Sequence, residues 1–196
     1  MITDKKNDQS KLDFIIVIGI PSSGKSTVRN QIKKQYSELC VISPDEIRER
    51  MLNVSVTKKS YDPSIESYVW TEAKDKLEYC IEEKKHIFFD ATNIKKALRN
   101  QFISKAKESG YTTKGIYLNI DPTLALFRQK NRERKVPEDV IYNMYYTMEK
   151  PTKDEFDILE IINKNAEKNE CLKLNGTWDE NSSNEYGRKC KMYYYI

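Results

Sequence analysis

Apolar residues form five short runs that alternate with longer segments of helical spacing. The runs cover residues 14–18, 39–42, 87–89, 116–120 and 156–162, and the first of them (FIIVI) is continuous and rich in β-branched residues. Apolar side chains recur at helical intervals over residues 25–36, 46–52, 65–84, 95–109, 123–134 and 138–149. Strands that alternate with helices build a parallel sheet covered on both faces. The pattern therefore predicts an α/β fold with a five-stranded parallel sheet flanked by helices.

The two ends of the chain lack this pattern. Residues 1–13 are charged and amide-rich, and we expect a disordered tail there. Residues 164–196 are rich in Asn, Glu, Lys and Ser, which predicts a polar extension that is disordered or forms a small add-on, such as a hairpin around Asn175-Gly176. We therefore expect one domain over residues 14–163, between a tail and an extension.

Composition and charge limit which classes of protein the chain can belong to. Lys and Arg number 34 against 30 Asp and Glu, and a pI near 8.7 is compatible with phosphate-rich ligands without requiring them. No apolar run approaches the roughly 20 residues that span a bilayer, and the first 13 residues hold no apolar segment typical of a secretion signal. A cytoplasmic protein without a membrane anchor is the expectation.

The four cysteines form no C-x-x-C pair, and the single histidine, His86, does not complete a metal site with them. Thiols stay reduced in the cytoplasm. We therefore expect free thiols, with Cys40 and Cys80 buried as small apolar side chains.

The clearest motif follows the first apolar run. Residues 19–26 (GIPSSGKS) match G-x-x-x-x-G-K-[ST], lie between a predicted strand and a predicted helix, and precede Thr27. Gly19 and Gly24 permit a backbone whose N–H groups, together with those of Ser22 and Ser23, point at phosphate oxygens. Lys25 adds a mobile charge for the β- and γ-phosphates, and the Ser26 hydroxyl suits Mg²⁺. The motif predicts a nucleoside-triphosphate site.

The rest of the chain favours a small kinase among P-loop proteins. A GTPase needs N-K-x-D, and the nearest string, residues 163–166 (NKNA), lacks the Asp. Asp45 follows the second predicted strand, beside the P-loop, where a carboxylate can accept the proton of an incoming hydroxyl. Arg48 lies three residues on and can hold a substrate phosphate in its fork. The alternative is that Asp45 only caps a helix and Arg48 is a surface charge.

The third predicted strand ends in Asp90 and runs into Ala91-Thr92-Asn93. A carboxylate there holds Mg²⁺ through water or orients the P-loop in P-loop enzymes, and a polar strand end is the alternative. Thr92 and Asn93 are predicted polar contacts to the substrate.

A basic stretch, residues 128–135 (RQKNRERK), precedes Val136-Pro137. Arg128 and Arg132 are four residues apart, so a helix would place both on one face. Two guanidinium groups that reach the γ-phosphate would neutralise transition-state charge, and the stretch therefore predicts a basic helical lid over ATP. A solvated helix end is the alternative.

Together these motifs resemble the P-loop 5′-hydroxyl polynucleotide kinases of the phage end-healing type and their small-molecule-kinase relatives. The resemblance rests on residues 19–27, 43–48 (SPDEIR), 88–93 (FFDATN) and the stretch from Arg128 to Met148. It implies transfer of the ATP γ-phosphate to a 5′-OH end of RNA or DNA. It also implies that Asp45 is the general base, that Arg48 holds the substrate phosphate, and that Arg128 and Arg132 engage ATP.

The resemblance implies separate repair partners as well. No D-x-D-G-T phosphatase motif accompanies the kinase motifs, so a ligase and a 3′-phosphatase would be other proteins.

Two other functions stay open at this point. The D-A-T-N order is common among the wider relatives, which phosphorylate small hydroxyl compounds such as sugar nucleotides (the zeta-toxin class) or nucleosides. The loop 53–63, with Lys58, Lys59 and Tyr61, could discriminate between these acceptors. An NTP-dependent nucleic-acid-binding module is the third function, with bases stacked on aromatic residues of the extension: Trp178 and residues 193–195, beside Lys191.

Overall fold

The computed structural model of the 196-residue chain describes residues 11–52, 63–130, 132, 135–164, 177–178 and 190–191. Five strands form one sheet in the order β2-β3-β1-β4-β5, and all four neighbouring pairs are parallel. They are β1 (Asp13–Ile18), β2 (Leu39–Ile42), β3 (His86–Asp90), β4 (Thr112–Ile120) and β5 (Ile158–Lys164). The predicted α/β fold with a five-stranded parallel sheet is confirmed.

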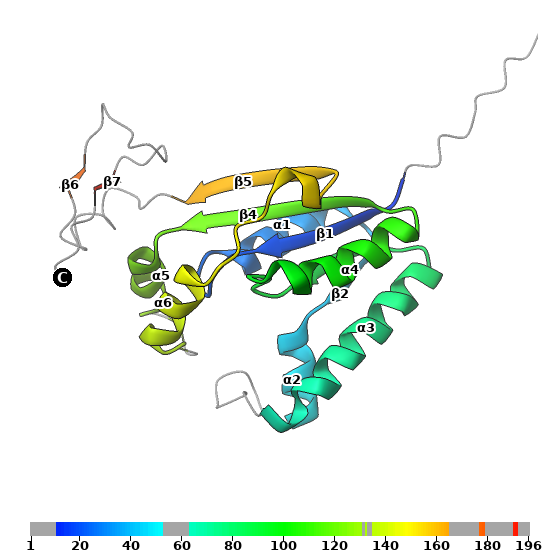
Figure 1. Cartoon of the computed structure of the whole chain (residues 1–196), viewed down its shortest axis with the longest axis horizontal. Helices are drawn as coiled ribbons and strands as arrows, with labels where there is room; N and C mark the ends of the chain where they lie inside the picture. The colour runs from blue at the N-terminus through cyan, green and yellow to red at the C-terminus, as the bar shows by residue number, and fades with distance from the viewer. Residues whose placement is uncertain are drawn as a thin grey trace, which may run out of the picture.

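Within the described ranges, six α-helices connect and flank these strands (Figure 1). They are α1 (Lys25–Gln35), α2 (Pro44–Leu52), α3 (Glu66–Glu82), α4 (Lys96–Glu108), α5 (Pro122–Gln129) and α6 (Glu138–Tyr146). Two short 3-10 turns, η1 (Pro63–Ile65) and η2 (Lys153–Glu155), precede α3 and β5. None of the helices in the described ranges combines the length and the hydrophobicity that crossing a bilayer requires.

Alternate residues of β1 point to opposite sides of the sheet and build two cores. Phe14, Ile16 and Ile18 pack with apolar residues of α2, α3 and α4, while Ile15 and Val17 pack with Val28 of α1. A third cluster joins the ends of β1 and β4 to α5 and α6, through Ile20, Ile120, Leu124, Ala125 and Ile141. The strand arrowheads in Figure 1 point toward α5 and α6, so these helices lie at the carboxyl edge, where ligands bind in such sheets.

The predicted element bounds need small corrections. β2 has the predicted bounds, but β4 begins four residues earlier than predicted, and β1 begins at Asp13, inside the predicted tail. Asp13 belongs to the sheet because it pairs with Thr112 of β4, and its carboxylate accepts hydrogen bonds from Tyr36 at 2.6 Å and Lys114 at 2.7 Å. The predicted disorder of residues 1–10 and the acceptor loop 53–62 lie outside the described residues.

The extension contains a small antiparallel pair, β6 (Thr177–Trp178) with β7 (Cys190–Lys191). The predicted hairpin around Asn175-Gly176 lies outside the described residues. The predicted base-stacking residues 193–195 lie outside the described residues.

Cys40 of β2 and Cys80 of α3 form a disulfide, with 6.1 Å between their Cα atoms. The prediction of free thiols is therefore wrong for this pair. Cys80 is wholly buried against the sheet edge, and the two residues are 40 positions apart, so no short motif announces the pairing.

One ion pair lies wholly inside the domain. The Arg99 guanidinium of α4 donates two bonds to the Glu155 carboxylate, at 2.8 and 2.9 Å, and the two side chains are 0% and 1% exposed. Its Nη1 donates to the carbonyls of Asn93 and Glu149, both at 2.9 Å. The pair thereby connects two segments: the one after α6, which holds Glu149 and Glu155, and the loop after β3, which holds Asn93.

Removing the Arg99 side chain should be costly. Arg99→Met leaves a buried carboxylate without its cation, and we expect a loss of about 3–5 kcal/mol in the free energy of unfolding, measured by urea denaturation. The matched control is Lys96→Met, because Lys96 pairs with Asp154 at the surface, where solvent screens the pair, and its loss should cost far less. Equal losses in the two variants would contradict the buried pair's role.

Candidate active site

The loop between β1 and α1 has the shape that the P-loop motif predicts. Gly24 has φ 101° and Ser22 φ 62°, both left-handed conformations. A side chain at Gly19 would begin 2.7 Å from the Ser23 hydroxyl oxygen, so the loop admits only glycine there. Ser23 is wholly buried, and its hydroxyl has no hydrogen-bond partner in the described part of the chain. The backbone is thus formed as a cradle with an unsatisfied polar group inside it.

The Lys25 side chain folds back into this cradle. Its Nζ donates to the carbonyls of Gly19 at 3.0 Å and Ile20 at 2.9 Å. Burial of the amine lowers the pKa of Lys25 from 10.5 to about 8; Asp90 and Asp45 oppose this shift, and Arg132 adds to it. The cradle, the mobile amine and the start of α1 fit the phosphates of a nucleotide.

Two residues could hold a magnesium ion beside these phosphates. Ser26 is exposed on the first turn of α1, as the motif requires. Asp90 lies at the end of β3, and burial raises the pKa of its carboxyl group, while Arg29 and Lys25 counteract part of that shift. A hydroxyl and a carboxylate are oxygen ligands of the kind that Mg²⁺ prefers.

Asp45 and Arg48 meet on one face of α2. The helix begins at Pro44, and the Ser43 oxygens accept the N–H groups of Glu46 and Ile47, so Ser43 rather than Asp45 caps it. This leaves the Asp45 carboxylate, 60% exposed, free to bond Arg48 Nη1 at 2.7 Å. The alternative of Asp45 as a helix cap is therefore ruled out by the helix start.

Glu66 completes this group, and sequence reasoning missed it. Arg48 donates from Nε and Nη2 to the two carboxylate oxygens of Glu66, at 2.6 and 2.9 Å. Glu66 is the first residue of α3, eighteen positions beyond Arg48, and no periodic pattern connects the two. In the sequence, Glu66 stands out only as an acidic residue in the first turn of a helix. An acidic side chain there usually indicates a favourable interaction with the helix dipole rather than a functional site.

The loop after β3 supports the cradle through its backbone. The Thr92 carbonyl accepts the Gly19 N–H at 3.0 Å. Asn93 is wholly buried, and its amide donates to the Val17 carbonyl at 2.7 Å. The Asn93 amide nitrogen thus holds β1 from inside the fold, and its substrate contact stays a prediction. The prediction for Thr92 stays a prediction.

The predicted lid has a different shape from the one expected. α5 ends at Gln129, whose buried side chain bonds both the N–H and the carbonyl of Val136, at 3.0 and 2.8 Å. The chain therefore turns after α5, and the prediction that Arg128 and Arg132 share one helix face is wrong. Arg128 lies in the last turn of α5, whereas Arg132 follows it and donates to the Ser22 hydroxyl at 3.2 Å. Arg132 thus touches the P-loop directly.

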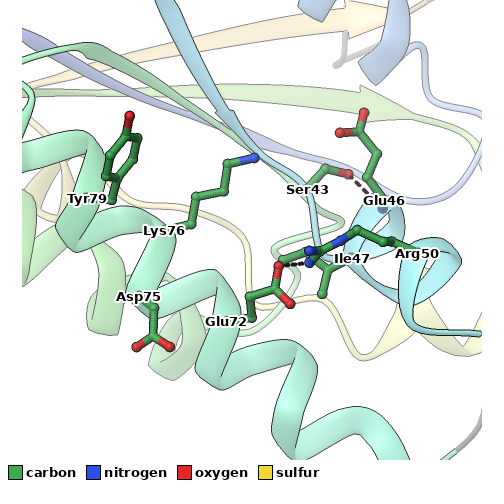
Figure 2. Close-up of a pocket in the computed structure, with 8 residues that line it drawn as sticks. All are labelled: Ser43, Glu46, Ile47, Arg50, Glu72, Asp75, Lys76 and Tyr79. Atoms are coloured by element: carbon green, nitrogen blue, oxygen red, sulfur yellow. Dashed lines mark hydrogen bonds and ion pairs between the residues drawn. The ribbon is translucent and has the colours of Figure 1, made fainter.

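An open groove of about 590 Å³ lies between α2 and α3 (Figure 2). It is lined by Ser43, Glu46, Ile47, Arg50, Glu72, Asp75, Lys76 and Tyr79. Figure 2 shows Arg50 reaching Glu72 from the opposite helix, where the two form an ion pair. Asp45 and Arg48 do not belong to this lining, so the groove is separate from the face that carries the predicted base.

The lowered pKa of Lys25 predicts how nucleotide affinity depends on pH. Phosphates bind the protonated amine and raise its pKa, so affinity for ATP should stay constant up to about pH 8 and then fall by up to about tenfold per pH unit. Titration calorimetry between pH 7.5 and 9.5 measures this slope. Lys25→Met should bind ATP more weakly and without the slope, and an equally steep slope in that variant would assign the titration to another group.

Comparison with known proteins agrees with this geometry. A family model described as an AAA domain (AAA_33) matches residues 14–151. The L-seryl-tRNA(Sec) kinase of Methanococcus maripaludis is 32% identical over 177 residues, which cover 83% of this chain and 66% of that protein. The chain therefore spans less than two thirds of the relative's length.

Two solved structures share the fold at low sequence identity. The Pnkp1/Rnl/Hen1 RNA repair complex aligns with a TM-score of 0.58 at 14% identity, covering 74% of this chain and 46% of that one. Chaetomium thermophilum Kti12 in complex with ADP-AlF3 aligns with a TM-score of 0.52 at 19% identity, covering 80% and 92%. With a phosphate cradle at the end of β1 and a family match over most of its length, the chain belongs to the AAA-domain family and has the fold of P-loop kinases.

Proposed function

We propose that this domain transfers the γ-phosphate of ATP to an acceptor hydroxyl that Asp45 deprotonates. The observation that carries the proposal is the common position of base and cradle: Asp45 lies in the first turn of α2, directly after β2, and the Lys25 cradle directly follows β1, so both lie at the carboxyl edge of one parallel sheet. The P-loop N–H groups, Lys25 and Arg132 hold the phosphates and neutralise charge as it develops. Ser26 and Asp90 would hold the Mg²⁺, which shields the phosphate oxygens from the incoming hydroxyl.

The charge around Asp45 favours one kind of acceptor. Two carboxylates, of Asp45 and Glu66, face the single guanidinium of Arg48, so the group carries a net negative charge. An acceptor phosphate would compete with Glu66 for the Arg48 fork, whereas a cation beside the reacting hydroxyl would be attracted. The α-ammonium of an amino acid esterified to RNA is such a cation.

The archaeal relative supports the same choice. Its name states that it acts on L-seryl-tRNA, and its 32% identity extends over 83% of this chain. We therefore take the hydroxyl of a seryl group on tRNA as the first candidate acceptor, phosphorylated in line with Asp45 as general base.

A 5′-OH end of RNA or DNA is the second candidate. The bonds to Asp45 and Glu66 use three of the five N–H groups of Arg48, and the remaining two can still bind an acceptor phosphate. With this acceptor, a ligase and a 3′-phosphatase would be separate proteins.

A single assay distinguishes these acceptors. γ-Labelled ATP is offered with seryl-tRNA, deacylated tRNA, a 5′-OH oligonucleotide, free serine and a panel of sugars and nucleosides. Label on seryl-tRNA that mild alkali releases as phosphoserine supports the first candidate, and label on the oligonucleotide supports the second. Label on neither, but on a sugar or nucleoside, would contradict both.

Asp45→Asn should slow the chemical step by about 10²–10⁴-fold, because the amide cannot accept the proton. ATP affinity, measured by calorimetry, should stay within about twofold. Asp75→Asn, an exposed carboxylate on α3, is the matched control and should keep full activity. Unchanged turnover in Asp45→Asn would reject Asp45 as the base.

Glu66→Gln should separate the two acceptors by the sign of its effect. With seryl-tRNA, loss of the carboxylate that attracts the ammonium should raise the acceptor KM by about tenfold or more. With a 5′-OH oligonucleotide, release of the Arg48 fork should lower the KM instead. Steady-state kinetics with both acceptors measures the change, and an unchanged KM for the active acceptor would remove Glu66 from the site.

A further inference from the structure

Two neighbouring residues in the first turn of α2 make contacts with different parts of the molecule. Asp45 bonds Arg48 on its own helix, whereas Glu46 forms an ion pair with Arg29 of α1. The same Arg29 guanidinium bonds Asp90 at the end of β3, from Nη1 to Oδ2 at 3.2 Å. One arginine therefore holds a carboxylate from the base-bearing helix and a carboxylate from the sheet.

Arg29 lies on the helix that begins at the P-loop, so the position of its side chain follows that of the P-loop. It lies four residues after Lys25, so the two side chains leave the same face of α1, whose first residue is Lys25 itself. Its side chain is 19% exposed, and that of Asp90 is 15% exposed. A partly buried guanidinium with two carboxylates on different elements has little freedom to move.

The other ion pairs of α2 point away from the phosphate cradle. Arg48 pairs with Glu66 and Arg50 with Glu72, and both partners belong to α3. α3 packs on the sheet through Val69, Ala73, Leu77 and Cys80 and has no bond to the P-loop among the described contacts. The ion pair of Glu46 with Arg29 thus connects α2 to the helix that starts at the cradle.

We propose that Arg29 and Glu46 are positioning residues that set the distance between Asp45 and the phosphate donor. The proposal rests on the proposed role of Asp45 as base. Glu46 fixes the first turn of α2 to α1, and Asp45 is the adjacent residue in that turn. Because proton transfer needs a heavy-atom distance near 3 Å, a small displacement of this turn slows the reaction without removing any reacting group.

The test compares Glu46→Gln with Glu72→Gln. Both variants remove the acid of an ion pair on the α2 surface, but only the first pair reaches α1. We expect Glu46→Gln to lower kcat by about tenfold or more, with ATP Kd and acceptor KM within about twofold of the parent. Glu72→Gln should keep the parent kcat, and Glu46→Asp, which retains the charge, should recover part of it.

A double-mutant cycle shows whether the two residues act together. Arg29→Gln combined with Glu46→Gln should be no slower than Arg29→Gln alone, since either change breaks the same contact. Additive losses, or a kcat unchanged in Glu46→Gln, would overturn the proposal, as would a fall in ATP affinity that matches the fall in kcat. The Asp45→Asn variant distinguishes failure of this proposal from failure of the proposed function. If Asp45→Asn is inactive while Glu46→Gln is fully active, the base assignment stands and only the positioning role fails.

Discussion

A desolvated ammonium group at the end of β1 sets the electrostatics of this domain. Lys25 lies within its own loop, and burial lowers its pKa to about 8, although two carboxylates favour the charged form. Its present partners are backbone carbonyls, which carry only partial charge. A polyphosphate would offer full negative charges at the same place, so the cradle favours that class of ligand.

Starting from the Lys25 amine, positively and negatively charged side chains alternate along a series of neighbouring groups. Asp90 favours the charged form of Lys25, Arg29 bonds Asp90, and Glu46 bonds Arg29. Arg29 holds carboxylates from two elements, which turns pairs that would be weak alone into a connected network. Arg99 does the same inside the fold, where it joins Glu155 to the backbone of two loops. Arg29 and Arg99 thus connect separate elements of the fold.

The sequence was sufficient for the donor half of the site. Gly19, Gly24 and Lys25 lie within seven residues, and apolar runs on each side identify the strand and the helix, so spacing alone predicts the cradle. The lid was harder, because Gln129 ends α5 through bonds to Val136 that no helical pattern announces. The bond of Asn93 to the Val17 carbonyl was equally hard to predict, because a polar residue after a strand resembles a ligand contact and its burial depends on the whole fold.

The acceptor half could not be predicted in the same way, and the reason is physical. Glu66 meets Arg48 across 18 positions, and Glu46 meets Arg29 across a complete strand and the segments beside it. Such contacts depend on the angle between α2 and its neighbours, which burial of Ile47 and the length of the segment before α3 determine. Phosphate geometry is the same for every ATP-dependent enzyme, so its binding loop can be a fixed motif. Acceptors differ in shape and charge, so the residues that recognise them come from elements outside that motif, and their chemistry has to be read from the assembled fold.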